Sequence, residues 1–530
     1  MTPPASRAVL GGRAGVSGHA RVSAGEHPDR AAAFDAGPLW MRILPPVAMF
    51  AMGLWRITGA SYWRDEAATM TAVQRPFPEI LRMMGNVDAV HGVYYMIIWA
   101  VVWLGGTGEL VTRLPSALAM ACAAAAVAAL GRRLVSPRAG LAAGLLLAAL
   151  PQISLYAQDA REYAAVTALA AAGSYLLVRA LSAAGRRAGW LAGYAVCLGL
   201  MGSLNVFSLL LVVAHAITVA VAAARAWRRD GGRAAGVSLA AGWLAAAAGA
   251  FLLASPILAL GIAQRGTLSW ITTPPLLGTI EGLRKLVGPA AMVLALCLAI
   301  ALGVVLDALA RRPLRASWPP ELLALCLPWL LLPPAVLIGV SYISPVYTFR
   351  YVIFCAPAAA LIGGAGLAAL VLPSPRGAPA WVPAVVALAV VAALGVPAQL
   401  AARGPDGHGT NIRKANAIVA RARRPADAVL YLGIDSNYFP AAYPGGFVKL
   451  DNVGQALTPS QAGNLVGTRL PASVIRARLG HIRRLWLVDF GPRPHPRLLH
   501  GLGFRLLRKW PPSQIWLLLY MRSGQVARFR

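Results

Sequence analysis

The stretch GVSLAAGWLAAAAGAFLLASPILAL, residues 236–260, decides the fold class because it holds no charged side chain over a length that can cross a bilayer. A hydrocarbon core about 30 Å thick needs roughly 20 consecutive apolar residues in a helix. The whole chain has the same character: 58% of its 530 residues are hydrophobic, only 13% are charged, and the mean hydropathy is +0.62. This composition excludes an ordinary soluble protein, in which about 25% of residues are charged.

Apolar runs of similar length recur up to residue 402 and predict an α-helical polytopic membrane protein with about 11 transmembrane helices. The stretch 93–105, VYYMIIWAVVWLG, is too short for a span, and we expect a juxtamembrane or re-entrant helix there. The predicted spans cover 39–57, 113–131, 139–157, 163–181, 189–204, 206–224, 236–260, 287–309, 320–342, 351–371 and 379–402.

The composition predicts three parts. Residues 1–38 are rich in Ala, Gly, Arg and Ser and lack hydrophobic periodicity, which is typical of a disordered basic tail. Residues 39–402 form the transmembrane part, with a long first outer loop at 58–112. In residues 403–530 the runs 426–433, 483–491 and 514–522 predict strands and 411–424 predicts a helix, so we expect a small α/β or α+β domain.

The net charge of +30 comes from 49 basic and 19 acidic residues. The arginines are scattered in short clusters between the apolar runs, which suits the positive-inside rule better than a nucleic-acid-binding face. This pattern places the N-terminus in the cytoplasm and predicts a multi-pass protein of the plasma membrane. The first outer loop and the C-terminal domain are then extracytoplasmic.

The scarce acids gather on the predicted outer side. Asp65 and Glu66 follow the first span in Trp63-Arg64-Asp65-Glu66-Ala67, and an adjacent pair of this kind can supply a general base close to lipid. A solvated pair of loop acids is an equally good interpretation of these residues alone. The short second outer loop adds Asp159, whose alternative interpretation is solvation of a helix end.

Several other polar residues lie on the same predicted side. Asp88 and His91 precede the short apolar helix, although a single His at such a position is more often structural. Arg113 opens the second span and Arg350 precedes the tenth. For the two arginines an interfacial anchor is as good an interpretation as a substrate contact.

Taken in order, these motifs resemble the C-type glycosyltransferase superfamily, in particular its family 39 branch of protein O-mannosyltransferase-like and aminoarabinose-transferase-like enzymes. The resemblance covers residues 40 to about 400, and it departs from the family pattern at Gly92-Val93, where relatives usually carry prolines. It rests on Trp63-Arg64-Asp65-Glu66-Ala67, Asp88-x-x-His91-x-x-Tyr94-Tyr95, Arg113-Leu114-Pro115-Ser116-Ala117, Gln158-Asp159-Ala160-Arg161-Glu162-Tyr163 and Arg350-Tyr351.

The resemblance implies transfer of a sugar, mannose or another hexose or pentose, from a polyprenyl-phosphate donor to a hydroxyl of a protein, lipid or glycan acceptor at the outer face. Asp65 would be the general base of an inverting reaction, with Glu66 and Asp159 as further catalytic residues. The substrate-binding residues would be Asp88, His91, Tyr94, Arg113, Arg161, Tyr163, Arg350 and Tyr351.

Two questions stay open at the level of sequence. The motifs require no cofactor, and they identify no metal site, although a divalent cation held by Glu66 and Asp159 is a candidate. The main alternative function is a multi-span transporter or lipid flippase. Such proteins tend to place ionisable groups near the bilayer midplane and to contain repeats, whereas these acids lie in outer loops and no repeat is apparent.

Overall fold

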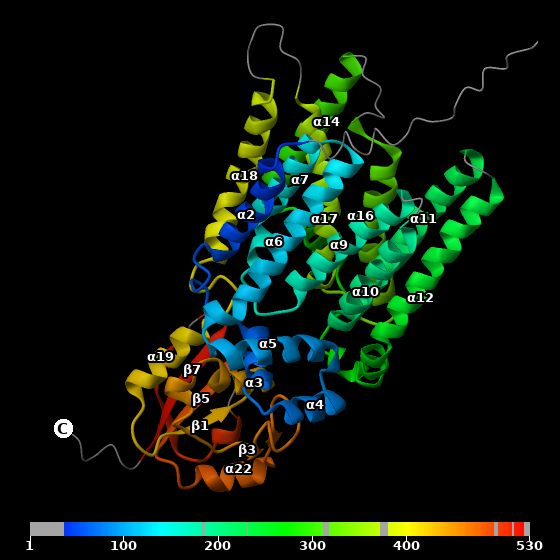
Figure 1. The fold of residues 1–530 in the computed structure, drawn as a ribbon. Coiled ribbons are helices and arrows are strands. Elements are labelled where there is room, and N and C mark those ends of the chain that lie inside the picture. Colours follow the sequence, from blue (N-terminus) through cyan, green and yellow to red (C-terminus); the bar gives the residue numbers. More distant parts are fainter. Residues whose placement is uncertain are drawn as a thin grey trace, which may run out of the picture.

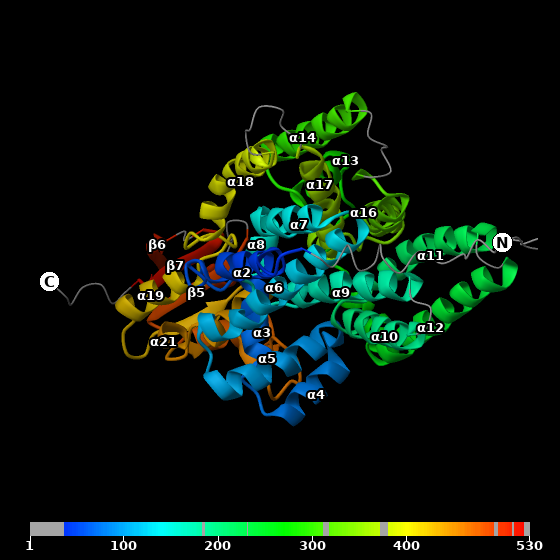
Figure 2. The same cartoon turned by 45° about the horizontal axis from the view of Figure 1, so that its top comes forward.

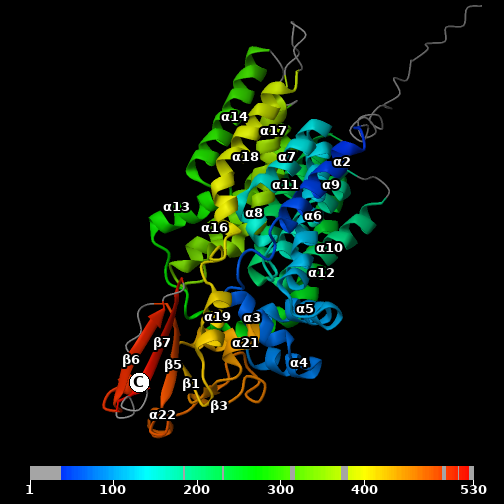
Figure 3. The ribbon, with the colours of Figure 1, turned by 90° about the vertical axis from the view of Figure 1, so that its left-hand side faces the viewer.

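The computed structural model describes residues 37–182, 186–229, 232–310, 317–371, 380–491, 497–510 and 513–523. The predicted N-terminal tail therefore lies outside the described residues, apart from its last two positions. A bundle of helices makes up most of the molecule, and a part that contains a β-sheet lies at one end of this bundle (Figures 1 and 3).

Eight helices among the described residues are long and apolar enough to span a membrane, and they confirm the prediction of a polytopic α-helical protein. The helix α17 (Ala356–Ala369) extends its span through the preceding 3₁₀ turn at Phe349–Cys355, and α11 (Leu210–Arg229) does so through the turn at Val206–Leu209. The others are α6 (Glu109–Leu134), α9 (Tyr163–Ser182), α12 (Arg233–Ala263), α14 (Ala290–Leu309), α16 (Pro320–Ser341) and α18 (Val382–Ala402).

The remaining three predicted spans are helical but are not among these eight, so the expected number of about eleven is not reproduced. The first is α2 (Trp40–Leu54), of 15 residues, and another is α10 (Arg187–Leu204), of 18 residues. The run 139–157 is divided into α7 (Pro137–Ala149) and α8 (Pro151–Tyr156). Pro151 causes this division because a proline disfavours the helical conformation of the residue before it.

Residues 58–112, the predicted first outer loop, contain three short helices. These are α3 (Arg64–Val73), α4 (Phe77–Asn86) and α5 (Gly92–Gly105). The prediction of a short apolar helix at 93–105 is confirmed by α5. The three helices lie across the end of the bundle that faces the sheet, whereas α9, α10, α11 and α12 run side by side along it (Figures 1 and 2).

The C-terminal part holds a five-stranded sheet in the order β2-β1-β5-β7-β6, in which β2, β1 and β5 are parallel and β7 is antiparallel to both of its neighbours. The three predicted strands are confirmed as β1 (Ala428–Tyr431), β5 (Arg484–Phe490) and β7 (Ile515–Arg522), and the predicted helix as α19 (Ile412–Ala422). The other strands are β2 (Asp451–Asn452), β6 (Phe504–Trp510) and the separate pair β3 (Gln455–Leu457) and β4 (Thr468–Arg469).

The sheet is covered on both faces. Val429, Trp486 and Val488 point into the large hydrophobic cluster that also contains the core of the bundle. Leu430 and Leu487 point to the other face, into a second cluster with residues of α22 (Ala472–Leu479). Since successive strand residues alternate between faces, the sheet packs against the helices at the end of the bundle, and this packing brings the loops of the C-terminal part close to α3.

Candidate active site

The predicted catalytic pair lies in the first turn of α3. Trp63 is extended, and its backbone amide donates a hydrogen bond of 3.3 Å to Oε2 of Glu66, which closes the N-terminus of the helix. Carboxylates in a first helical turn are stabilised by the helix dipole and by unpaired amides. Asp65 is 8% exposed and Glu66 is fully buried, so this acid pair is not a solvated loop pair.

Glu66 is held by a buried bidentate ion pair with Arg113. Nε and Nη2 of Arg113 lie 2.7 Å from Oε1 and Oε2 of Glu66, and the backbone amide of Ala160 donates a third bond of 2.9 Å to Oε1. Nη1 of Arg113 donates to the carbonyl oxygens of Ile57 and Ala60, at 2.8 and 2.9 Å. This network ties together α3, the start of α6 and the short loop after α8.

Asp65 lies between two cations. Nε of Arg64 is 3.1 Å from Oδ1 of Asp65, and Nη2 of Arg350 is 3.4 Å from its Oδ2. Burial by itself raises the pKa of Asp65, but Arg350, Arg161 and Arg64 outweigh burial and lower the pKa to about 2. Asp65 is therefore an ionised carboxylate at neutral pH.

Asp159 is fully buried beside this pair. The indole Nε1 of Trp63 donates a bond of 2.9 Å to Oδ1 of Asp159, while Oδ2 has no partner among the described residues. Burial and the neighbouring carboxylates Glu66 and Asp65 hold the pKa of Asp159 well above its usual range, against the effect of Trp63 and Arg161. The three predicted catalytic acids are thus brought together, with the pKa of Asp65 lowered and that of Asp159 raised.

A second polar cluster surrounds His91. Its Nδ1 is 3.2 Å from Oε1 of Glu162, and its Nε2 is 3.8 Å from Oδ1 of Asp88. Nη2 of Arg161 lies 3.0 Å from Nδ1 and 2.8 Å from Nε2 of His91. Burial raises the pKa of Glu162, but Arg161 and His91 lower it to about 2. Asp88 also accepts a hydrogen bond of 2.5 Å from the hydroxyl of Tyr95.

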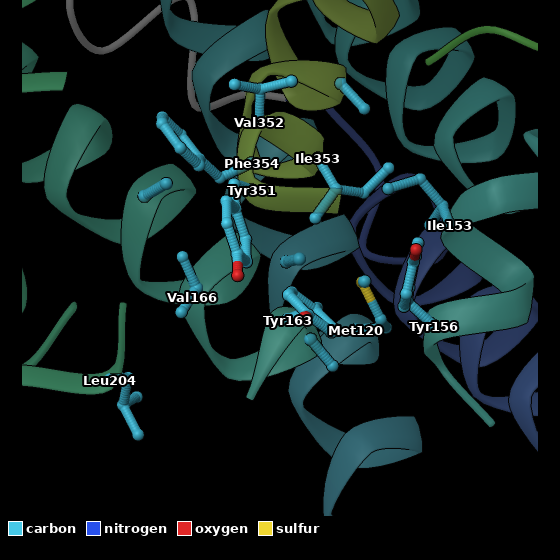
Figure 4. Packing of buried hydrophobic residues seen from close by; sticks show 14 of the residues in the cluster. Met120, Ile153, Tyr156, Tyr163, Val166, Leu204, Tyr351, Val352, Ile353 and Phe354 are labelled. Atoms are coloured by element: carbon cyan, nitrogen blue, oxygen red, sulfur yellow. The ribbon is translucent and has the colours of Figure 1, made fainter. Parts of the chain in front are cut away.

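The predicted tyrosines are buried around these clusters. Tyr94 lies in α5 and is 2% exposed, and Tyr163 lies at the start of α9 and packs edge-on against Tyr156 at 5.0 Å. Tyr351 stacks on Phe207 with ring centroids 5.1 Å apart. Tyr163, Tyr156 and Tyr351 belong to the buried hydrophobic cluster drawn in Figure 4.

An apolar cavity of about 230 Å³ opens next to the charged residues. His91 of the second polar cluster lines it, and so does Tyr351, whose ring lies 5.9 Å from the guanidinium of Arg350. Arg265 adds a cation that we did not predict from the sequence. The rest of the lining is largely apolar and includes Leu204, Val206, Phe207, Leu258, Ile262 and Leu268.

The C-terminal part contributes residues that the sequence did not indicate. Nδ1 of His408 is 3.6 Å from Oε2 of Glu66, and Oδ2 of Asp435 is 3.3 Å from Nη1 of Arg64. The indole of Trp270, from the loop after α12, lies over Arg64 and Arg350 at 5.4 and 5.3 Å. No local motif marks these residues, because only the tertiary fold brings them to α3.

One group of side chains has the composition of a metal site. Glu66, Asp159 and His408 offer ligand atoms that all lie within 4.8 Å of one another. Glu66 accepts bonds from Arg113 on both oxygens, and further bonds from Ala160 and Trp63. Among the described residues, Asp159 Oδ2 and His408 Nδ1 have no hydrogen-bond partner, although His408 Nδ1 lies 3.6 Å from Glu66 Oε2. The residues present therefore do not fit a dedicated metal site, and no cofactor is established.

The comparisons with known proteins concern a segment of the sequence and the fold. Residues 92–260 match the family model for dolichyl-phosphate-mannose-protein mannosyltransferase. No curated protein matches the sequence significantly. ArnT from Cupriavidus metallidurans bound to undecaprenyl phosphate has a similar fold, with a TM-score of 0.51 and 14% identity over 90% of this chain and 97% of that one.

Two further solved structures are similar. ArnT from the same organism in the apo state has a TM-score of 0.51 and 13% identity over the same shares of the two chains. The Archaeoglobus fulgidus oligosaccharyltransferase AglB, solved with an inhibitory peptide and a dolichol-phosphate, has a TM-score of 0.45 and 10% identity over 85% of this chain and 69% of that one. At such identities the likeness is one of fold. The fold and the matched segment confirm the resemblance to the C-type glycosyltransferase superfamily that the sequence motifs indicated.

Proposed function

We propose that the chain transfers a sugar from a polyprenyl-phosphate donor to an acceptor hydroxyl, with Asp65 as general base. The observation that carries this proposal is the ionised Asp65 between two arginines, beside an apolar cavity at the end of the bundle. A lipid-linked sugar needs an apolar place for its isoprenoid and positive charge for its phosphate. Both requirements are met near the ionised Asp65, and this carboxylate favours a transferase, since a transporter or flippase of the same lipid needs no general base.

The donor would enter with its isoprenoid in the cavity and its phosphate toward Arg350, Arg161 and Arg265. Arg350 directly precedes Tyr351, which lines the cavity, and Arg161 contacts His91, which also lines it. Guanidinium groups suit this role because they bind phosphate oxygens bidentately. The structure of ArnT with undecaprenyl phosphate supports this choice of donor class.

Asp65 would take the proton of the acceptor hydroxyl as that oxygen attacks the anomeric carbon. Arg350 is shared between this carboxylate and the expected position of the phosphate. When a donor phosphate binds Arg350, the ion pair between Arg350 and Asp65 becomes weaker. The pKa of Asp65 then rises, so the carboxylate is a stronger base only when the donor is present.

We propose inversion at the anomeric carbon, since Glu66 and Glu162 are engaged in ion pairs and the raised pKa of Asp159 disfavours its carboxylate as a nucleophile. Glu66 is tied to Arg113, and Glu162 lies against Arg161 and His91. These two acids, with Arg113, would act as positioning residues that hold α3 and the loop after α8. Asp159 would orient Trp63, whose ring lies 5.7 Å from the guanidinium of Arg350. We thus propose that Arg113 positions α3 through its ion pair with Glu66 and does not contact the donor.

The domain limits of the chain and its orientation in the membrane are also part of the proposal. We propose that residues 58–112 form the catalytic outer loop of a transmembrane part at 39–402, and that 403–530 form a separate extracytoplasmic domain. Both would lie on the outer face of the plasma membrane, with the N-terminus in the cytoplasm. The concentration of arginine in the predicted inner loops supports this orientation.

Arg350→Ala is expected to weaken use of the donor more than use of the acceptor. It removes the cation that faces both Asp65 and the proposed phosphate position, and a hydrogen bond to a charged group contributes about 1.5–3 kcal/mol. We therefore expect the KM for the polyprenyl-phosphate sugar to rise by about tenfold or more, measured by the rate at which label leaves the carrier. The matched control is Arg284→Ala, which removes a surface arginine paired with Glu281. Equal changes in the KM for donor and acceptor would argue for a structural role.

Transfer is expected to persist in the presence of EDTA. Since Arg113, Ala160 and Trp63 together occupy both oxygens of Glu66, a divalent cation would find only Asp159 and His408 as further protein ligands of this group, whereas dedicated sites supply more. The measurement is the transfer rate of membranes washed with EDTA against the rate after addition of Mg²⁺, Mn²⁺ or Zn²⁺. Abolition by EDTA with full recovery on adding one ion would show that a cation is required.

A further inference from the structure

The side chain of Arg64 lies where the C-terminal part meets the transmembrane part. Its guanidinium contacts Asp65 at 3.1 Å on one side and Asp435 at 3.3 Å on the other. The rings of Trp270 and Phe490 lie 5.4 and 5.9 Å from its central carbon. Arg64 is 24% exposed and Asp435 34% exposed, so solvent reaches these charged side chains next to the proposed base, and we call this accessible region the opening.

Trp270 gives this opening an aromatic wall. Half of its surface is exposed, and its ring covers Arg64 and Arg350, the two cations that flank Asp65. An interfacial anchor would account for an exposed indole, but it would not account for a ring that faces the two arginines of the site. An exposed aromatic face beside carboxylate and guanidinium groups is suited to a sugar ring, which presents C–H bonds on its faces and hydroxyls at its edge.

A pocket of about 80 Å³ lies in the C-terminal part beside Asp435. Two of its lining residues, Gly433 and Asn437, flank Asp435 in the sequence. The remaining polar lining consists mainly of neutral groups, and Arg469 already donates to the carbonyl of Leu432 at 3.0 Å. Its polar side chains come from Tyr431, Asn437, Asn452, Gln455, Thr468 and Arg469.

The neutral amides and hydroxyls indicate the class of ligand. A buried polar group needs a hydrogen-bond partner, and the buried hydroxyl of Tyr431, a lining residue, has none among the described residues. An anionic ligand would meet Asp435 at the opening. A hydroxyl-rich neutral chain, in contrast, can donate to Asp435 and exchange hydrogen bonds with the amides of Asn452 and Gln455.

We propose that the C-terminal part binds the acceptor, and that the acceptor is a hydroxyl-rich glycan. This inference rests on the proposed function. The reacting sugar lies against the exposed edges of Trp270, Arg64 and Asp435, and the chain behind it extends toward the neutral pocket. The acceptor O–H gives its proton to Asp65, a new C–O bond forms at the anomeric carbon of the donor sugar, and the bond from that carbon to the phosphate oxygen breaks, with the electron pair leaving on the polyprenyl phosphate.

The first test follows the label. Membranes that contain the full-length protein are incubated with radiolabelled polyprenyl-phosphate sugars and the total envelope material of the cells that produce it, and the product is treated with protease or with periodate. We expect the label in large material that resists protease and is degraded by periodate. Label in peptides after protease would overturn the inference and leave the proposed function standing. If no sugar leaves its carrier, the proposed function fails first.

The second test uses variants of the opening and the pocket. Asp435→Asn, Asn452→Ala and Trp270→Ala are each expected to raise the KM for the envelope acceptor by about tenfold, the effect of roughly 1.4 kcal/mol. The KM for the donor should be unchanged in Asp435→Asn and Asn452→Ala, and Trp270→Phe should retain the acceptor KM of the unsubstituted protein.

The controls are Asp451→Asn, an exposed acid of the same part, and Trp227→Ala, an exposed tryptophan on α11 that lies over Arg233. Both should behave like the unsubstituted protein. An unchanged acceptor KM in Asp435→Asn and Asn452→Ala would overturn the inference.

Discussion

Asp65→Asn is expected to lower the rate of sugar transfer by about 10²–10⁴-fold, the usual contribution of a positioned general base. Asn has nearly the same shape as Asp but cannot accept the proton of the acceptor hydroxyl. Arg64 and Arg350 stay in place, so we expect membrane insertion and donor binding to be retained. The measurement is the initial rate of label transfer, combined with donor binding at equilibrium.

The control for this substitution is Asp451→Asn, which makes the same chemical change at an exposed position of the C-terminal part. It should leave the transfer rate unchanged. The ionised state of Asp65 at neutral pH, with its pKa lowered to about 2, means that the base does not have to be deprotonated before the reaction. An Asp65→Asn protein that transfers sugar at a rate near that of the unsubstituted chain would show that another group is the base.

Arg113→Ala is expected to destabilise the fold by about 3–5 kcal/mol, because it leaves the carboxylate of Glu66 buried without its cation. The two residues are fully buried, and Arg113 also binds the carbonyl oxygens of Ile57 and Ala60. We expect a large drop in the melting temperature of the purified protein and a matching loss of folded protein in the membrane.

Two further variants separate this effect from direct contact with the donor. Arg113→Met combined with Glu66→Gln removes both charges and should recover much of the melting temperature, since replacing a buried ion pair costs less than breaking it. Arg284→Ala breaks the exposed pair with Glu281 and should change stability by at most about 1 kcal/mol. A stable Arg113→Ala protein with an increased KM for the donor would instead assign Arg113 to donor binding.

Local sequence motifs predicted which residues come together in the candidate site, but they did not predict which residue each of them contacts. The motif Trp63-Arg64-Asp65-Glu66 places its acids in the first turn of α3, and Asp159 and Arg161 come together with them, as their common predicted side implied. Arg113 differs, because a motif does not reveal that its Nε and Nη2 are bound to Glu66 while its Nη1 donates to the carbonyl oxygens of Ile57 and Ala60.

The residues that the sequence did not indicate come from distant segments. His408, Asp435 and Trp270 reach the site only because the sheet packs on the end of the bundle and the loop after α12 folds back over α3. Hydropathy has a similar limit in the fold: the run 139–157 is continuously apolar, yet Pro151 divides it into two helices. Likewise β6 was not predicted, because five of its seven residues are exposed and carry no apolar alternation.

The most direct test of the proposed reaction is to reconstitute the purified full-length protein in lipid vesicles with a series of radiolabelled polyprenyl-phosphate sugars and the envelope acceptor material. One measurement follows release of the label from the carrier, and a second follows movement of the carrier across the bilayer. Our account predicts that the label of at least one sugar leaves its carrier and joins the acceptor, and that Asp65→Asn stops this release. Movement of intact labelled carrier across the bilayer, with no release from any sugar, would contradict the account and point to a flippase.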